Sequence, residues 1–114
     1  MQEEHRESSV REGVIRDFVE KEVPDDWNTW DMARRQTFWS GGDKGTHNMV
    51  PRDRVCALEV WVEAFGGNIK QMKYADAREI NAVIGAMPGW KRPKSNIRFG
   101  PSYGAQRGFI KPQR

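Results

Sequence analysis

The sequence has 114 residues, of which 37% are hydrophobic and 31% are charged, and its formal net charge is +3. This length suits one domain, and the five Trp and five Phe residues can supply the apolar surface of a core. A single cysteine excludes an internal disulfide framework, and no apolar run approaches the ~18 residues that a membrane span requires. The N-terminus lacks the apolar centre of a signal peptide, so we expect a cytoplasmic protein with no membrane contact.

Charge is distributed unevenly along the chain. Residues 1–31 hold ten acidic and four basic side chains, whereas residues 90–114 hold seven basic side chains and no acidic one. A basic end of this kind attracts a polymer of phosphates, because each neutralised phosphate releases counterions. The alternative is an ordinary solvated tail. The seven cations are Lys91, Arg92, Lys94, Arg98, Arg107, Lys111 and Arg114.

Residues 1–39 predict two helices. A capping-box pattern begins at Ser9, and the apolar residues after it recur at helical spacing, so we expect a helix that starts there and ends before Pro24. Asn28 or Thr29 is expected to cap a second, short helix over residues 30–39. The glycine-rich residues 40–50 predict a flexible loop.

Residues 51–89 predict two stronger helices. The first, over about 53–65, is apolar on most of its circumference and should lie in the core, with Trp61 among its buried groups. The second, over about 76–87, begins at a capping-box-like pattern and carries its apolar residues on one face. Arg78 and Asn81 lie on the opposite face of this second helix.

Residues 90–114 predict a basic β-hairpin. Apolar and basic residues alternate over 97–99, turn-forming residues follow over 100–104, and residues 106–111 can return as a second strand. Tyr103 lies at the expected tip. Its ring either stacks on a nucleic-acid base or covers the hairpin, and the sequence favours neither.

The elements together predict one domain, residues 1–114, that is mainly α with a small C-terminal β-hairpin. A helix, a connection, a second helix and a basic hairpin follow one another in the order of a winged helix-turn-helix. In that motif the second helix enters the major groove of DNA. The connection here, about residues 66–75, is longer than the tight turn of the strict motif.

No catalytic, cofactor or metal site is expected in this chain. The glycine-rich stretch over 40–46 lacks the Gly-Lys-Ser/Thr triplet of a phosphate-binding loop. His5, His47 and Cys56 lack the spacing of metal ligands, and nothing orients His47 and Cys56 as a nucleophile pair. Glu59 and Glu63 lie one helical turn apart, and we interpret them as solvated charges rather than as a catalytic carboxylate pair.

Several short motifs occur in a characteristic order. They are RDRVCALEVW over 52–61, REIN over 78–81, PGW over 88–90, and RFGP over 98–101, followed by Tyr103-Gly104 and Gln106-Arg107. Together they resemble the C-terminal end of the virulence-associated protein E family, over nearly the whole chain. Members of this family are phage and prophage replication proteins that join such a tail to a primase or helicase-like ATPase region. The resemblance implies a fragment or free-standing copy of a replication protein in a bacterial host, with any ATPase outside these residues.

Charge and element order predict a non-catalytic module that binds nucleic acid, with DNA as the first expectation. Lys73, Arg78 and Asn81 should lie at or near the helix that approaches a groove, and the last two can chemically read bases. The alternatives are a docking or oligomerisation module that contacts the ATPase region, and self-inhibition in which residues 1–31 mask residues 90–114. The expected phosphate contacts are Lys91, Arg92, Lys94, Arg98, Arg107 and Lys111.

Overall fold

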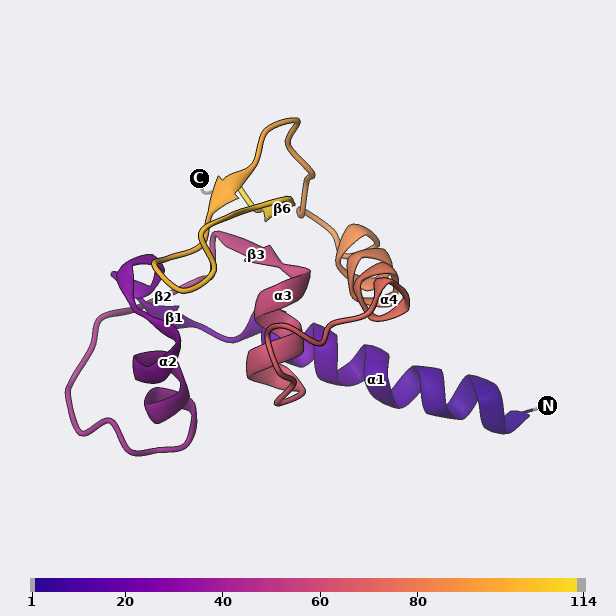
Figure 1. The fold of residues 1–114 in the computed structure, drawn as a ribbon, viewed down its shortest axis with the longest axis horizontal. Coiled ribbons are helices and arrows are strands. Elements are labelled where there is room, and N and C mark those ends of the chain that lie inside the picture. The colour runs from indigo at the N-terminus through magenta and orange to yellow at the C-terminus, as the bar shows by residue number, and fades with distance from the viewer. Residues whose placement is uncertain (1, 113–114) are drawn as a thin grey trace.

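The computed structural model describes the backbone of residues 2–112 and the side chains of residues 10–112. Helices form most of its regular structure, and α1 runs along one edge with α3 and α4 beside it (Figure 1). The helices are α1 (Gln2–Glu20), η1 (Trp27–Thr29), α2 (Met32–Trp39), α3 (Ala57–Glu59), η2 (Val60–Ala64) and α4 (Tyr74–Gly85). Here η1 is a single 3₁₀ turn, and η2 is a π-helical turn that continues α3.

One apolar core lies where α1, the α3–η2 helix and α4 meet. Ile80 and Ile84 are four residues apart on α4 and are fully buried against Ile15 of α1 and Val60 of η2. Burial of such a side chain stabilises the fold by about 1.5–3 kcal/mol. A second cluster of Trp27, Trp30 and Val23 packs α2 onto the rest of the chain.

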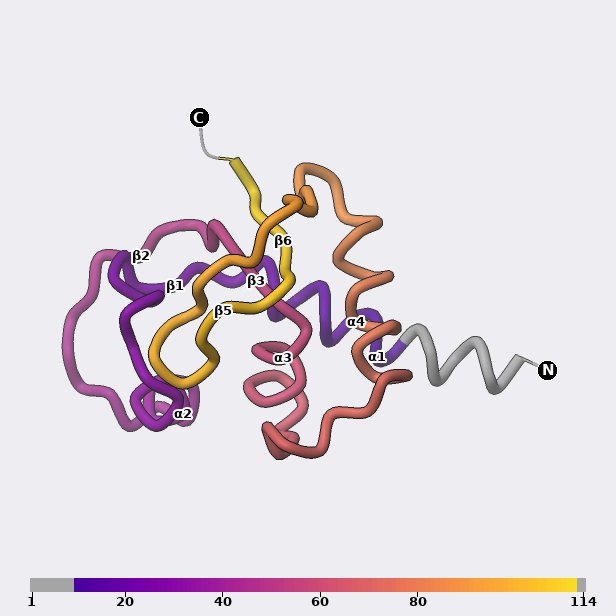
Figure 2. The backbone as a smooth tube through the Cα atoms, turned by 45° about the horizontal axis from the view of Figure 1, so that its top comes forward, coloured from indigo at the N-terminus to yellow at the C-terminus, as the bar shows by residue number. Residues whose placement is uncertain are grey.

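Three short antiparallel strand pairs complete the part of the fold that the structure describes. The segment β5 (Ala105–Gln106) pairs with β4 (Ile97–Arg98), and β6 (Gly108–Ile110) pairs with β3 (Arg54–Cys56). Only Arg107 separates β5 from β6, so the returning chain pairs first with β4 and then with β3 (Figure 2). The third pair joins β1 (Val23–Pro24) to β2 (Met49–Val50).

The first two helices begin at other residues than the sequence predicts. Residue 9 lies inside α1, which already starts at Gln2, so Ser9 is not its N-cap. The end of α1 at Glu20 agrees with the predicted stop before Pro24. The N-cap of α2 is Asp31, whose side chain accepts a hydrogen bond of 2.8 Å from the Arg34 N–H.

The predicted helix over 53–65 is shorter than expected, because residues 54–56 form β3 instead of a first helical turn. Gly108 explains why β3 and β6 can pair so closely. A Cβ atom at this position would lie 2.6 Å from the Phe99 ring and 2.6 Å from the Val55 carbonyl oxygen. The next helix, α4, begins at Tyr74, two residues earlier than predicted, and Asp76 caps it by accepting from the Lys73 N–H at 3.2 Å.

The coarse prediction of a mainly α domain with a small C-terminal hairpin is confirmed. The hairpin is formed by β4 and β5, whereas residues 108–110 leave it to pair with β3, which the sequence does not predict. Residues 40–48 form the predicted loop, and its end continues into β2. Within residues 2–112 no helix has both the length and the apolar character that crossing a membrane requires.

Candidate nucleic-acid interface

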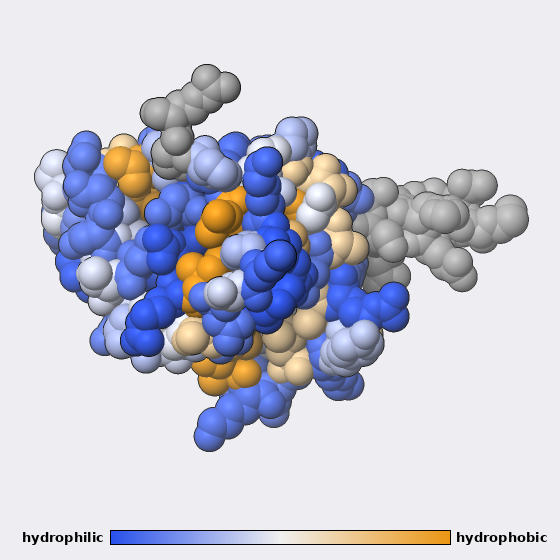
Figure 3. Space-filling model, turned by 90° about the horizontal axis from the view of Figure 1, so that it is seen from above, coloured by the Kyte–Doolittle hydropathy of each residue, from blue (hydrophilic) through white to orange (hydrophobic). Residues whose placement is uncertain are grey.

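A cleft of about 330 Å³ separates α4 from the C-terminal hairpin. Its polar lining consists of two guanidinium groups and three amides, and its apolar lining comes mainly from β3, α3 and the start of α4. Hydrophilic side chains dominate the face that carries the C-terminal strands, with small apolar patches between them (Figure 3). The polar lining residues are Asn81, Arg92, Asn96, Gln106 and Arg107, and the apolar ones are Cys56, Ala57, Leu58, Met72, Ala77 and Ala105.

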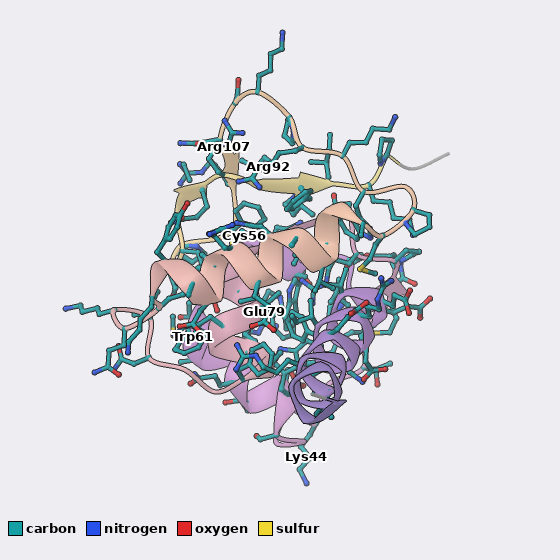
Figure 4. All side chains as sticks on the ribbon, turned by 90° about the vertical axis from the view of Figure 1, so that its right-hand side faces the viewer. Lys44, Cys56, Trp61, Glu79, Arg92 and Arg107 are labelled. Atoms are coloured by element: carbon teal, nitrogen blue, oxygen red, sulfur yellow. The ribbon has the colours of Figure 1, made fainter. Side chains whose placement is uncertain are left out.

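The carboxylates of α4 do not line this cleft. Figure 4 shows Arg92 and Arg107 close together on the hairpin side of α4, whereas Glu79 lies on the side that faces α1. Glu79 accepts a hydrogen bond of 2.8 Å from Arg11 of α1, and Asp76 lies 3.7 Å from the same guanidinium. Arg11 therefore holds both acidic groups of α4 away from the cleft.

The two arginines of the cleft make no ion pair with any described residue. The Arg92 guanidinium lies 4.9 Å from the centre of the Phe109 ring, and Arg107 donates a hydrogen bond of 3.4 Å to the Lys94 carbonyl oxygen. Lys91, Lys94 and Arg98 are exposed and likewise form no ion pair within residues 10–112. These positive charges are thus not neutralised by carboxylates of the described chain.

The predicted phosphate contacts nevertheless do not form a single patch. Arg98 pairs across the hairpin with Ala105, a residue that lines the cleft. Lys111 lies elsewhere, with its ammonium 5.8 Å from the Trp90 ring and in a hollow that Glu20 and Glu22 also line. Arg114 lies outside the described residues.

The helix α4 presents its two predicted base-reading residues differently. Arg78 is exposed on the outer face, and its guanidinium lies 5.7 Å from the ring of Tyr74, which is 77% exposed. Tyr74 is not among the candidate residues that the sequence predicts, because the helix is expected to begin at residue 76 and α4 begins at Tyr74. Asn81 instead lines the cleft, and Lys73 lies in a separate hollow with Trp61, Gln71 and Asp76.

Tyr103 is not an exposed residue at the hairpin tip. It is 5% exposed, its hydroxyl donates a hydrogen bond of 2.7 Å to Glu63, and its ring faces the Arg35 guanidinium at 5.4 Å. Burial, together with the Glu63 carboxylate, raises the pKa of Tyr103 far above its usual range. Of the two roles that the sequence leaves open, the structure shows the packing one, and we remove Tyr103 from the candidate interface.

Glu59 and Glu63 are buried, which corrects their interpretation as solvated charges. Arg35 of α2 donates to Glu59 at 2.6 Å and to Glu63 at 3.0 Å, and none of these three side chains is exposed. Arg52 is also buried, with its guanidinium 3.7 Å from Glu59. Burial raises the pKa of Glu59, and the neighbouring Arg52 and Arg35 oppose that rise.

Cys56 has the properties of a core residue. Burial raises the pKa of its thiol well above the ordinary value, which disfavours the nucleophilic thiolate. His47 interacts instead with Asp43 at 3.2 Å and packs against Trp30. Among the residues that the structure describes, no group of three His, Cys, Asp or Glu side chains is arranged to hold a metal ion.

Comparison of the sequence with models of known protein families and with curated proteins gives no match. Two groups of residues remain as candidates for function. One is the buried ionic cluster, which consists of Arg35, Arg52, Glu59 and Glu63. The side chains of its two glutamates are not accessible to solvent, which suits a structural role. The other is the open cleft with Arg92 and Arg107, which can receive an anionic ligand.

Proposed function

We propose that this chain is a non-catalytic module that binds nucleic acid at the cleft between α4 and the C-terminal hairpin. The observation that carries the proposal is that Arg92 and Arg107 line the cleft while no carboxylate does. A phosphate bound there meets two cations without having to displace an internal anion. Guanidinium–phosphate hydrogen bonds are among the strong, charge-assisted kind.

We further propose that the chain is a winged helix-turn-helix, with α4 as the recognition helix and residues 97–106 as the wing. The pairing pattern supports this. A strand (β3) precedes the α3–η2 helix and α4, and the chain then returns through β4, β5 and β6 so that β6 meets β3. In this arrangement the wing lies beside α4, and both can contact one ligand.

The order of short motifs over residues 52–111 supports a role in replication. We propose that the chain is part of, or related to, a phage or prophage primase–helicase-like protein in the cytoplasm of a bacterial host. DNA is then the expected polymer, and the ATPase region of such a protein is a possible second partner.

A docking module is the second candidate function, and one observation favours it. Val10 and Val14 of α1 are 64% and 38% exposed, although they belong to the apolar side of that helix. Val14 also lines a hollow with Phe18, Trp39 and Ala64. A partner that covered this side of α1 would bury apolar surface without involving the cleft.

Titration with labelled single-stranded and double-stranded DNA of about 20 nucleotides at several salt concentrations tests the proposal. The affinity should fall linearly with salt on logarithmic axes, because binding releases counterions. Replacing Arg92 and Arg107 together with Gln should reduce the slope by about 2, since each lost phosphate contact removes roughly one unit.

The matched control replaces Arg16 of α1 and Lys21, the residue that follows α1, with Gln. This control removes the same formal charge as the Arg92 and Arg107 replacement. Arg16 pairs with Glu12 and Lys21 pairs with Asp17, and both carboxylates belong to α1. This variant should keep the slope of the wild-type protein. Absence of binding at low salt, or an equal loss of slope in both variants, would contradict a nucleic-acid site in the cleft.

A further inference from the structure

The cleft contains more than phosphate-binding groups. Asn81, Asn96 and Gln106 bring three side-chain amides to the same space as the two arginines. An amide presents a hydrogen-bond donor and an acceptor side by side, which is the pattern found on the edges of nucleobases. A site for phosphate alone would need cations and N–H donors, but no acceptors.

Asn81 is the amide in the cleft whose oxygen lacks a hydrogen-bond partner among the described residues. Its Oδ1 atom is buried, and the side chain has no hydrogen-bond partner among the described residues. A buried acceptor without a partner destabilises a fold, because it has lost its water and gained nothing in return. Because the Asn81 side chain lines the cleft, a turn of its amide would bring the oxygen to the cleft, where an N–H group of a ligand would satisfy it. The exocyclic amino group of a base is such a donor.

The apolar lining suits the faces of a base. Leu58, Met72 and Ala77 line the same cleft as Asn81, so a flat ring that enters it meets aliphatic and thioether groups. The volume of about 330 Å³ lies within the range of about 300–1,000 Å³ that small-molecule sites occupy. The cleft therefore combines apolar walls, a base-edge partner and, at Arg92 and Arg107, partners for phosphate.

We infer that the cleft receives one unpaired nucleotide, and that the ligand of this module is single-stranded nucleic acid. The base lies between α4 and the hairpin with its edge at Asn81, and the flanking phosphates lie at Arg92 and Arg107. A base held in a duplex is stacked and paired, so its edge cannot enter a cleft in this way. This inference rests on the proposed binding of nucleic acid at the cleft and narrows its substrate class to single strands; α4 then acts through the side that lines the cleft and does not enter a duplex groove.

The outer face of α4 fits this assignment. Asn81 lines the cleft, so the outer face of the helix offers a duplex groove one cation, Arg78, beside the exposed Ala82. Readout of a major groove usually relies on bidentate side chains such as Arg or Asn. Arg78 can make such a contact with guanine, but Asn81, the residue able to make one with adenine, lines the cleft instead.

Binding of labelled single-stranded dA, dC and dT 15-mers and of a 15-base-pair blunt duplex, at one salt concentration, tests the inference. We expect the single strands to bind at least tenfold more tightly than the duplex. Asn81→Leu should weaken single-strand binding about five- to tenfold and leave the salt slope unchanged. Ala82→Leu, one residue further along α4 and exposed, is the matched control and should change neither.

Asn81→Asp provides a second variant of nearly identical shape, and it should weaken single-strand binding further by placing a negative charge beside the phosphates. Duplex binding as tight as single-strand binding, or full affinity in both Asn81 variants, would overturn the inference. If binding still depends on Arg92 and Arg107 in that case, the proposed function stands and only the single-nucleotide assignment fails. If the wild-type protein binds neither polymer, the proposed function itself fails.

Discussion

The buried ionic cluster and the open cleft are built from the same kind of cation in opposite settings. Arg35 and Arg52 lie in the interior beside Glu59 and Glu63, and their charges are balanced there. Among the described residues, the arginines of the cleft have no carboxylate beside them. The comparison teaches that the placement of the acidic residues, more than the number of basic ones, decides which arginines can receive an anion.

The two regions are also connected. Besides its two carboxylate partners, Arg35 donates to the carbonyl oxygens of Trp27 at 3.1 Å and Phe99 at 3.3 Å. Phe99 and Tyr103 are buried residues of the C-terminal hairpin segment. Other residues of the same segment, among them Ala105 and Gln106, line the cleft. The cluster thus fixes the hairpin to α2 and η2, and it holds the cleft in shape without touching a ligand.

Among the substitutions that test this comparison, Glu59→Gln should cause the largest loss in the free energy of unfolding. The change leaves two buried guanidinium groups with one remaining carboxylate, and loss of one partner from a buried ion pair costs about 3–5 kcal/mol. Urea denaturation at neutral pH measures the free energy of unfolding. Glu22→Gln, at an exposed position on the same protein, should change that free energy by less than about 0.5 kcal/mol. A loss below about 1 kcal/mol in the first variant would show that the cluster is not essential to the fold.

Tyr103→Phe should lower the free energy of unfolding by less than Glu59→Gln. It removes the hydroxyl that donates to Glu63, and a hydrogen bond to a charged group contributes about 1.5–3 kcal/mol to stability. Thermal and urea unfolding should both detect the loss, while the affinity for DNA should not change in conditions where the variant is folded. Tyr74→Phe, which is exposed, should leave stability unchanged. Weaker DNA binding with unchanged stability would return Tyr103 to the interface.

The sequence predicts the parts of the fold that depend on local pattern. The 3.6-residue spacing identifies α1, the α3–η2 helix and α4, and alternation over 97–99 indicates the hairpin. It does not predict β3, because residues 54–56 become a strand only through pairing with residues 108–110, more than fifty residues away. Strand preference depends on such tertiary context more than helix preference does.

The candidate site is predictable to a similar degree. Arg92 and Arg107 belong to the C-terminal quarter, which has no carboxylate side chain, and both line the cleft. A charge count cannot show that Lys111 lies in a hollow with Glu20 and Glu22. The burial of Tyr103 follows from Glu63, a residue forty positions away. One signal for the cluster was present in the sequence. Two carboxylates on the most apolar helix require buried cations as partners, because unpaired charges are rarely buried.

Asp43 and His47 form a pair near the surface, in an environment that differs from both the buried cluster and the cleft. Its loss should change the stability of the fold least. The Gly45 N–H donates to Asp43 at 2.7 Å, and His47 lies 3.2 Å away; these two hydrogen bonds lower the pKa of Asp43. A carboxyl whose pKa is lower in the folded state stabilises the fold above its unfolded pKa of about 3.9, and that contribution is lost as the pH falls.

Asp43→Asn should therefore lower the urea midpoint slightly at pH 7, and the difference from the wild-type protein should disappear near pH 2–3. Asp26→Asn serves as the control, because Asp26 is exposed and its side chain makes no capping hydrogen bond. Its midpoint should follow that of the wild-type protein across the same pH range. An Asp43→Asn difference that persists unchanged at low pH would mean that shape, and not charge, fixes the loop. Ion pairs at the protein surface contribute little, so a large midpoint shift would place Asp43 with the buried cluster.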